Sequence, residues 1–402
     1  MRLFRKIHPQ IWSGILLAAL LGGCRQALPA PTPSPTAVIP TATQTAPLPS
    51  PTSTPTPLPT PTNTPTPLPT FTPTPPVLVE AGTPLPPDLE PITYENALMV
   101  SGLAQFKQNS VTDLGWAPDG STLAVASYAG ISLYDPYART QTGELETRPG
   151  VISIDFNPLG SLLAVGQRRG SEDTSFAGAV DLWRVPSWQE AGLIWGGNQA
   201  VSQVDFSPGG NILAVALTSA DYSAGQVIFW NVSDWQITRT LDVPGLHNIA
   251  YSPTGSLLAT SPDRYAVMIY SIPIFQRLHT LRTSFTGAVN CLVFSPDGTT
   301  LATGHYDGEI RLWNVLTGEL VRVLKSDGVV ESLAFNQDGS LLASGQGFDS
   351  NRVHLWELDI EQPIRSLDGH SSAVVSLEFS PDGRMLASGS YDGNVWLWGI
   401  RP

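Results

Sequence analysis

The sequence predicts an all-β fold, a seven-bladed β-propeller over residues 93–402, preceded by a signal peptide and a disordered Pro/Thr-rich linker. Two observations carry this prediction. A short turn motif ending in glycine recurs seven times, and alternating apolar strands flank every copy. A period of about 40–45 residues with four strands corresponds to one propeller blade per repeat.

The turn motif has the same chemistry in most repeats. Its second residue is usually proline, which presets φ, and its last residue is glycine, which supplies a left-handed conformation. The fullest copies read Ala-Pro-Asp-Gly and Ser-Pro-Asp-Gly. The motif glycines are Gly120, Gly160, Gly210, Gly255, Gly298, Gly339 and Gly383.

Strands are predicted on both sides of each turn. Before the turn, apolar residues two apart share one strand face, as in Leu377 and Phe379. After it comes a short apolar strand with small residues, such as 341–345, which suits close packing between sheets. A third strand usually ends in an aromatic residue, and a fourth, more variable strand follows. The aromatic column is Tyr134, Trp183, Trp230, Tyr270, Trp313, Trp356 and Trp398.

The last repeat carries the fullest set of motifs. It contains Gly369-His370, Phe379-Ser380-Pro381-Asp382-Gly383, Leu386-Ala387-Ser388-Gly389-Ser390, Asp392-Gly393 and Leu397-Trp398. This segment resembles a WD40 repeat, and the seven copies extend the resemblance over residues 93–402. Most other repeats lack the Gly-His pair, and none ends in Trp-Asp.

The resemblance implies a structural role for four polar and aromatic residues of this repeat. His370, Ser388, Asp392 and Trp398 are expected to form a hydrogen-bonded network that ties the outer loop to the inner strands, with Ser390 as an alternative to Ser388. The same residue types occur in Ser-His-Asp triads. No nucleophile-elbow glycine pattern surrounds either serine. We therefore assign no catalytic residue.

The N-terminus, residues 1–23, is predicted to be a lipoprotein signal peptide. Arg2, Arg5 and Lys6 precede an apolar run over 11–21, which is too short to span a bilayer. The run ends Leu21-Gly22-Gly23-Cys24 and resembles a bacterial lipobox. That resemblance implies that Cys24 is lipidated and becomes the mature N-terminus; an ordinary signal peptide is the alternative. The expected location is extracytoplasmic, lipid-anchored to a membrane of a bacterial cell envelope.

Residues 24–92 are predicted to be a disordered linker that follows the lipidated cysteine. No Asp, Glu, Lys or Arg occurs from Gln26 to Val79, and Pro and Thr dominate. Such a segment has little apolar surface to bury and favours extended, polyproline II-like conformations. We expect it to act as a spacer.

Composition excludes some function classes. The net charge is −13, and no dense Lys/Arg cluster is present, so nucleic-acid binding is not expected.

The six histidines lack metal-ligand spacing, and no cofactor or metal site is predicted. Asp155, Asp205 and Glu378 share one strand position. They could ring a channel cation, but hydrogen-bonded polar residues near the axis are the preferred interpretation. Cys291 is expected to pack as a small apolar residue.

The last repeat reaches only its third strand before Pro402. An open ring would expose a sheet edge, which proteins avoid. We therefore expect a strand within Thr93–Gly102 to complete blade 7.

Three blades have long links between their second and third strands, at the face that also carries the blade-to-blade loops. Aromatic and Arg side chains are common interface anchors, and loops on rigid scaffolds often carry function. Neutral surface insertions are the alternative. The expected partner-binding residues are Arg168, Arg169, Glu172, Asp173 and Phe176 in blade 2, Asp221 and Tyr222 in blade 3, and Phe348, Asp349 and Arg352 in blade 6.

These features predict a non-enzymatic extracytoplasmic scaffold that presents a protein- or peptide-binding face. Two alternatives stay open at this point. One is a propeller hydrolase or lactonase with a channel metal, and the other is a module that senses a glycan or small ligand. A shared fold does not choose among them.

Overall fold

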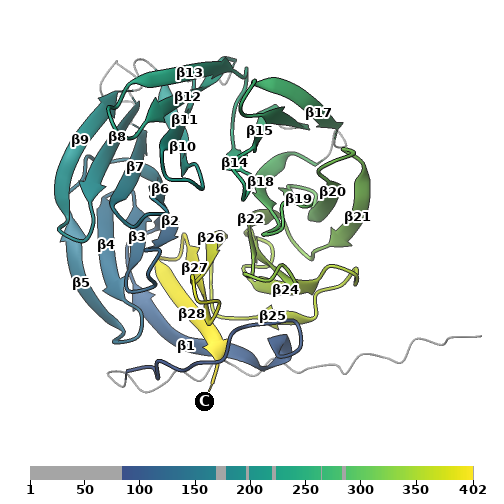
Figure 1. The fold of residues 1–402 in the computed structure, drawn as a ribbon. Coiled ribbons are helices and arrows are strands. Elements are labelled where there is room, and N and C mark those ends of the chain that lie inside the picture. Colours follow the sequence, from purple (N-terminus) through teal and green to yellow (C-terminus); the bar gives the residue numbers. More distant parts are fainter. Residues whose placement is uncertain are drawn as a thin grey trace, which may run out of the picture. The chain divides into compact units, whose positions relative to one another are not determined.

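A computed structural model describes residues 84–168, 178–195, 199–219, 223–263, 265–282 and 287–401. They belong to the compact unit Pro69–Pro402, which is a seven-bladed β-propeller (Figure 1). The predicted fold class is confirmed. Cys24, the expected signal peptide and the linker up to residue 83 lie outside the described residues.

Each blade is a four-stranded antiparallel sheet, with its first strand nearest the axis (Figure 1). Blades 1 to 3 are β2 (Val111–Trp116), β3 (Leu123–Ser127), β4 (Gly130–Asp135), β5 (Thr140–Leu145); β6 (Val151–Phe156), β7 (Leu162–Arg168), β8 (Gly178–Arg184), β9 (Gln189–Trp195); β10 (Ala200–Phe206), β11 (Ile212–Thr218), β12 (Gly225–Asn231), β13 (Ile237–Asp242). Blades 4 and 5 are β14 (Ile249–Tyr251), β15 (Leu257–Asp263), β16 (Ala266–Ser271), β17 (Gln276–Arg282); β18 (Val289–Phe294), β19 (Thr300–His305), β20 (Glu309–Asn314), β21 (Leu320–Lys325). Blades 6 and 7 are β22 (Val330–Phe335), β23 (Leu341–Gln346), β24 (Val353–Glu357), β25 (Arg365–Leu367); β26 (Val374–Phe379), β27 (Met385–Ser390), β28 (Asn394–Ile400), β1 (Val100–Lys107).

The seven motif glycines all adopt the left-handed conformation that the sequence predicts. Their φ angles lie between +68° and +73°. In blade 7 the Gly383 N–H donates to the Ser380 carbonyl at 2.8 Å, and the other six turns have the same bond. Because this φ is costly for residues with a Cβ, glycine sets the connection between first and second strands.

The hydrophobic core lies between blades. Each of its seven clusters combines residues from two neighbouring sheets, so every blade is packed on both faces. The second strands hold one alanine each at the same place, and all seven have no exposed surface: Ala124, Ala164, Ala214, Ala259, Ala302, Ala343 and Ala387. Small side chains in this column permit close sheet-to-sheet approach, as the sequence predicts.

The ring is closed by an N-terminal strand, but not by the expected residues. β1 pairs antiparallel with β28, from Val100 opposite Ile400 to Lys107 opposite Asn394. The expected segment, Thr93–Gly102, supplies only the start of this strand. Residues 97–99 instead form a 3₁₀ turn, η1 (Ala97–Met99), in which Ala97 is buried against blades 6 and 7.

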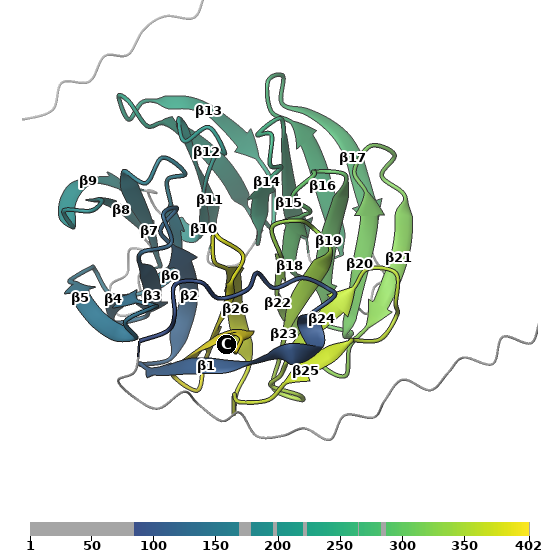
Figure 2. The same ribbon diagram turned by 60° about the horizontal axis from the view of Figure 1, so that its bottom comes forward.

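The folded unit also starts earlier than the predicted boundary at residue 93. Residues 84–92 lie across blades 1, 7 and 6 as an N-terminal strap (Figure 2). Leu85, Leu89 and Ile92 are at most 4 % exposed. The Leu85 N–H donates to the Tyr137 carbonyl and the Ile92 N–H to the Gly383 carbonyl, both at 2.8 Å. These apolar contacts and hydrogen bonds place the strap in the propeller rather than in the linker.

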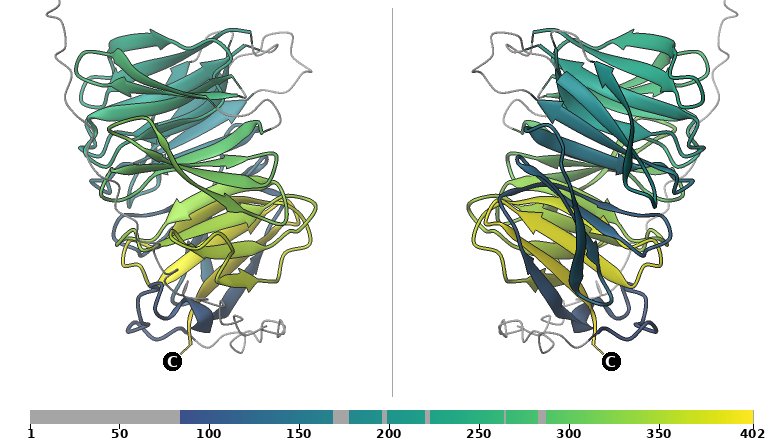
Figure 3. Two further views of the ribbon diagram at one scale, coloured as in Figure 1. Left: turned by 90° about the vertical axis from the view of Figure 1, so that its right-hand side faces the viewer. Right: turned by 90° about the vertical axis from the view of Figure 1, so that its left-hand side faces the viewer.

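Seen from the side, the strands run between two faces of the propeller (Figure 3). One, here termed the link face, carries the links from second to third strands, including 128–129, 306–308, 347–352 and 391–393. The other, the turn face, carries the glycine turns and the strap. In the described part of the chain, no helix has the length and apolar character needed to cross a membrane.

Candidate interaction face and central channel

The mouth of the central channel at the link face is built from β-bulges. In six blades the first strand shifts register around its second residue. A bulge leaves one residue unpaired and re-aims its side chain. The re-aimed residues are Thr112, Ile152, Ser202, Asn290, Glu331 and Val375; in blade 4, His247 stands before β14 at the corresponding place.

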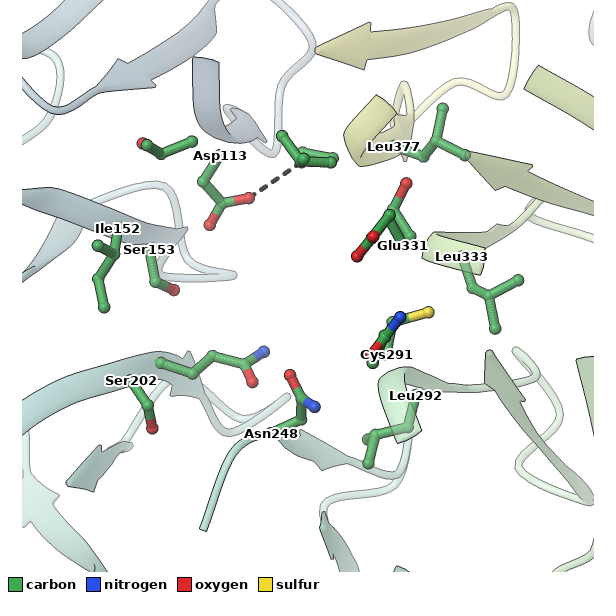
Figure 4. A pocket seen from close by; sticks show the side chains of 16 residues that line it. Asp113, Ile152, Ser153, Ser202, Asn248, Cys291, Leu292, Glu331, Leu333 and Leu377 are labelled. Atoms are coloured by element: carbon green, nitrogen blue, oxygen red, sulfur yellow. Dashed lines mark hydrogen bonds between the residues drawn. The ribbon is translucent and has the colours of Figure 1, made fainter. Parts of the chain in front are cut away.

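The six bulge residues line a polar cavity of about 300 Å³ at the axis. Figure 4 shows Asp113, Asn248 and Glu331 extending toward the space between the first strands. A neighbouring cavity of about 220 Å³ lies between His247, Asn290 and Glu331. Among the described residues, the lining of both cavities includes carboxylates but no Lys or Arg.

Side chains of one blade cap the free edge of the next blade along part of the ring. Innermost strands are sheet edges, and their unpaired N–H groups need acceptors. The Ile154 N–H donates to Asp113 Oδ2 at 2.9 Å. Equivalent caps join Val204 to Ser153 Oγ, Ile249 to Gln203 Oε1 and Leu114 to Ser376 Oγ.

A second set of caps uses the carboxylates that share one strand position. The N–H groups of Phe206, Tyr251 and Trp116 donate to Asp155, Asp205 and Glu378 at 2.5, 2.9 and 3.0 Å. The corresponding residues of blades 4, 5 and 6 are Ala250, Val293 and Ala334, whose side chains accept no hydrogen bond. With the Asp113 cap between blades 1 and 2, carboxylate caps therefore join blades 7 and 1, 1 and 2, 2 and 3, and 3 and 4.

Burial raises the pKa of these carboxyl groups. Desolvation raises the pKa of Asp113 to about 6, of Asp205 to about 7 and of Glu378 to about 8, although backbone N–H donors oppose the shift. The pKa of Asp155 is raised well above its usual value by burial and by the neighbouring Asp205. All four side chains keep part of their surface exposed, which moderates these effects.

The capping role accounts for Asp155, Asp205 and Glu378 without a channel cation. Each already accepts a backbone N–H from the next blade. Within the described ranges, no three His, Cys, Asp or Glu side chains are arranged to hold a metal ion. Cys291 has a free, partly exposed thiol, and burial strongly raises its pKa.

Exposed aromatic side chains recur on the link face. Each described link from second to third strand outside blades 2 and 3 carries one, between 42 % and 68 % exposed: Tyr128, Tyr265, Tyr306, Phe348 and Tyr391. Of these five residues, only Phe348 was predicted from the sequence. The other four could have been found from the aromatic residue within the link itself, as in Tyr-Asp-Gly at 306–308 and 391–393.

The residues expected to bind a partner are only partly described. Arg168 ends β7, whereas Arg169, Glu172, Asp173, Phe176, Asp221 and Tyr222 lie outside the described residues. Phe348 and Asp349 are exposed on the link face. Arg352 is bound within the propeller, because its Nε donates to Asp368 at 2.8 Å and its Nη1 to Asp327 at 3.2 Å.

The four residues expected to form a network in blade 7 are hydrogen-bonded in series. Trp398 Nε1 donates to Ser388 Oγ at 2.8 Å, and Ser388 Oγ lies 2.8 Å from His370 Nε2. His370 Nδ1 faces the Asp392 carboxylate at 3.3 Å. Ser388 and the His370 side chain are at most 1 % exposed, so Ser388 Oγ is not open to a substrate.

Blades 5 and 6 have related networks that the sequence did not predict. Trp313 Nε1 donates to Thr303 Oγ1 at 3.0 Å, and Trp356 Nε1 donates to Ser344 Oγ at 2.7 Å. Thr303 and Ser344 stand at the same register offset from their tryptophan as Ser388. This shared offset between the hydroxyl residue and the tryptophan could have predicted the two networks.

The model of the family "WD domain, G-beta repeat" matches residues 275–314, 318–357 and 361–399. These three segments end with the tryptophan-bearing third strands of blades 5, 6 and 7. Blades 5, 6 and 7 carry WD40 repeats. The likeness predicted from the seven turn motifs is thereby confirmed, and the propeller has the blade number counted from the sequence.

Known proteins are similar to parts of this chain. Protein tipD of Dictyostelium discoideum is 26 % identical over 62 % of this chain and 39 % of its own length. "Cell division cycle 20.4, cofactor of APC complex" of Arabidopsis thaliana is 28 % identical over 77 % of this chain and 69 % of its own length. The periodic tryptophan protein 2 homolog of Schizosaccharomyces pombe is 36 % identical over 28 % of this chain and 13 % of its own length.

Blades 2 and 3 lack the tryptophan network of the three WD40 repeats. Trp183 and Trp230 occupy the same column, but their buried indole Nε1 atoms have no acceptor among the described residues. Val165 and Val215 stand where blade 7 has Ser388. A hydrogen bond of this kind contributes about 1 kcal/mol. Blades 5 to 7 are thus held by internal networks, whereas carboxylate caps concentrate on the other side of the ring.

Proposed function

We propose that this chain is a non-enzymatic interaction scaffold that binds a protein or peptide on the link face. The observation that carries the proposal is the recurrence of exposed aromatic side chains on this face around the channel mouth. Contiguous exposed apolar patches often mark interaction sites, and aromatic residues are enriched among those that dominate binding energy.

The relatives support a role in protein assemblies. The Arabidopsis relative is named a cofactor of a complex, and a second relative from Dictyostelium discoideum is named an anaphase-promoting complex subunit. Those names describe those proteins. For this chain, the names of the relatives favour a binding function over catalysis, and they do not identify its partner.

The proposal includes display of the propeller outside the cytoplasmic membrane by lipid on Cys24. It is supported by the basic start, the short apolar run and the Leu21-Gly22-Gly23-Cys24 sequence, followed by a long Pro/Thr-rich segment. Several acyl chains on one residue give stable membrane anchoring, whereas one chain binds only weakly.

Replacing Cys24 by serine is expected to prevent lipidation, because serine offers no thiol for the thioether bond. The Cys24→Ser protein should remain unprocessed or appear in the soluble fraction, as measured by membrane fractionation and gel migration of the full chain. Cys291→Ser is the matched control and should fractionate like wild type. A Cys24→Ser protein that fractionates and migrates like wild type would refute the anchor.

Removing link-face aromatics is expected to weaken partner capture at least tenfold. The variant Tyr128→Ser, Tyr306→Ser, Phe348→Ser removes three exposed side chains, and losses of this size are common for central interface aromatics. Capture is measured by crosslinking the full chain in its native cells and quantifying co-purified proteins. The control, Leu159→Ser with Leu316→Ser, removes apolar side chains that are 73 % and 85 % exposed elsewhere. Equal capture by both variants would place binding away from the link face.

A further inference from the structure

We propose that the channel mouth on the link face binds the cationic side chain of a lysine or arginine carried by a peptide partner. The cation lies between the Glu331 carboxylate and the aromatic rings of Tyr128, Phe348 and Tyr391, a group termed here the cation site. This inference rests on the scaffold function proposed above and specifies the chemistry that its face recognises.

Glu331 is a carboxylate without a counter-charge. It is the bulged residue of β22, lines both axial cavities and is partly buried. In the described part of the chain its carboxylate forms no hydrogen bond or ion pair, and desolvation raises its pKa. A partly desolvated carboxylate gains most from a cation that replaces its lost hydration.

No Lys or Arg among the described residues satisfies Glu331. Arg352 follows in the same link as Phe348, but Asp368 and Asp327 hold its guanidinium. The described lining of the cavities has no Lys or Arg, and the whole chain has a net charge of −13. Charge complementarity therefore favours a basic ligand at this mouth.

Phe348 and Tyr391 stand beside this carboxylate on blades 6 and 7, and Tyr128 of blade 1 lies near Tyr391. Phe348 and Tyr391 are stacked, with ring centroids 6.3 Å apart and an interplanar angle of 26°. Glu331 lies against Gly347, because a Cβ on that glycine would be 3.2 Å from Glu331 Oε1. Burial raises the pKa of Tyr391, and the nearby Tyr128 and Glu331 add to the shift. Faces of such rings attract ammonium and guanidinium groups.

A sugar could also stack on exposed aromatic rings. The uncompensated carboxylate distinguishes the two ligands, since a neutral sugar leaves its charge unbalanced and a cation neutralises it. The larger cavity, about 300 Å³, has room for one long side chain beyond the ring of aromatics.

The test uses blocked pentapeptides of sequence Gly-Gly-Xaa-Gly-Gly, with Lys, Arg or Gln at the central position. Binding to the soluble Cys24→Ser chain is measured by NMR titration. We expect the Lys and Arg peptides to bind at least roughly tenfold more tightly than the Gln peptide. Glu331→Gln should remove this preference, and Phe348→Leu, which keeps an apolar side chain but no ring, should weaken it about two- to fivefold.

Glu319→Gln is the matched control, because it removes an exposed carboxylate that lies just before β21, the outermost strand of blade 5. This variant should bind like wild type. Thermal melting checks that every variant is folded. Equal binding of the Gln peptide, or an unchanged Lys preference in Glu331→Gln, would overturn the cation site. Binding of N-acetylglucosamine disaccharide that is independent of Glu331 would assign the mouth to a sugar instead.

Partner capture separates this inference from the scaffold function. If Glu331→Gln captures crosslinked partners like wild type while the triple aromatic variant does not, the scaffold function stands and the cation site is wrong. If both variants lose capture and the Lys preference is present, both proposals are supported.

Discussion

Leu103→Ala is expected to destabilise the propeller by about 2–5 kcal/mol. Leu103 lies in β1, has no exposed surface, and fills the space beside Gly399 of β28. β1 is the outer strand of blade 7, so weakening its pairing exposes the edge of β28. Urea unfolding followed by tryptophan fluorescence measures the change in the free energy of unfolding.

Leu98→Ala is the matched control for Leu103→Ala. Leu98 belongs to η1, just before β1, but is 42 % exposed. Its replacement should change the free energy of unfolding by less than about 0.5 kcal/mol. If the two substitutions have equal effects, β1 does not close the ring in the way described.

Glu378→Gln is expected to reduce the loss of stability that wild type suffers as the pH rises from 6.5 to 9. Burial raises the folded-state pKa of Glu378 to about 8, so the folded protein keeps this proton at a pH where the unfolded chain has released it. The stabilisation is present at low pH and is lost as the pH rises through 8. The expected difference between variant and wild type over this range is about 1–2 kcal/mol.

The comparison with Glu378→Gln isolates this carboxyl group, because Asp205, whose pKa is raised to about 7, titrates in the same range in both proteins. His305, whose pKa burial lowers to about 4, acts in the opposite direction only below pH 6.5. Glutamine still accepts the Trp116 N–H, whereas Glu378→Ala leaves that donor unpaired and should cost about 1–3 kcal/mol at every pH. Asp88→Asn, at an exposed strap residue, should behave like wild type. A wild-type stability that rises from pH 6.5 to 9, or an identical slope in Glu378→Gln, would contradict the assignment.

Predictions from sequence succeeded where the responsible interactions are local. A turn such as Ser380–Gly383 needs only its own proline, carboxylate and glycine. Its conformation can therefore be predicted from these four residues alone. The aromatic column and the buried alanines follow from alternation along single strands. Repetition then made the blade number countable.

The N-terminal strap escaped prediction because its partners are remote in the chain. Leu85 and Ile92 stand among prolines without periodicity, and they become buried only against Tyr137 and Gly383. The closing strand was expected, but its start at Val100 depends on register with β28, almost three hundred residues away. Lipidation of Cys24 stays a prediction.

The sequence by itself determined the seven-bladed ring, because each blade repeats the same local turn and strand pattern. Only the tertiary structure decided which polar residues meet. Asp155, Asp205 and Glu378 look alike in sequence, yet their role depends on the N–H of the next blade. Glu331, Phe348 and Tyr391 come from blades 6 and 7 and become neighbours only when those blades pack together. Sites formed between repeats require the angle and register at which those repeats pack, which no single repeat encodes.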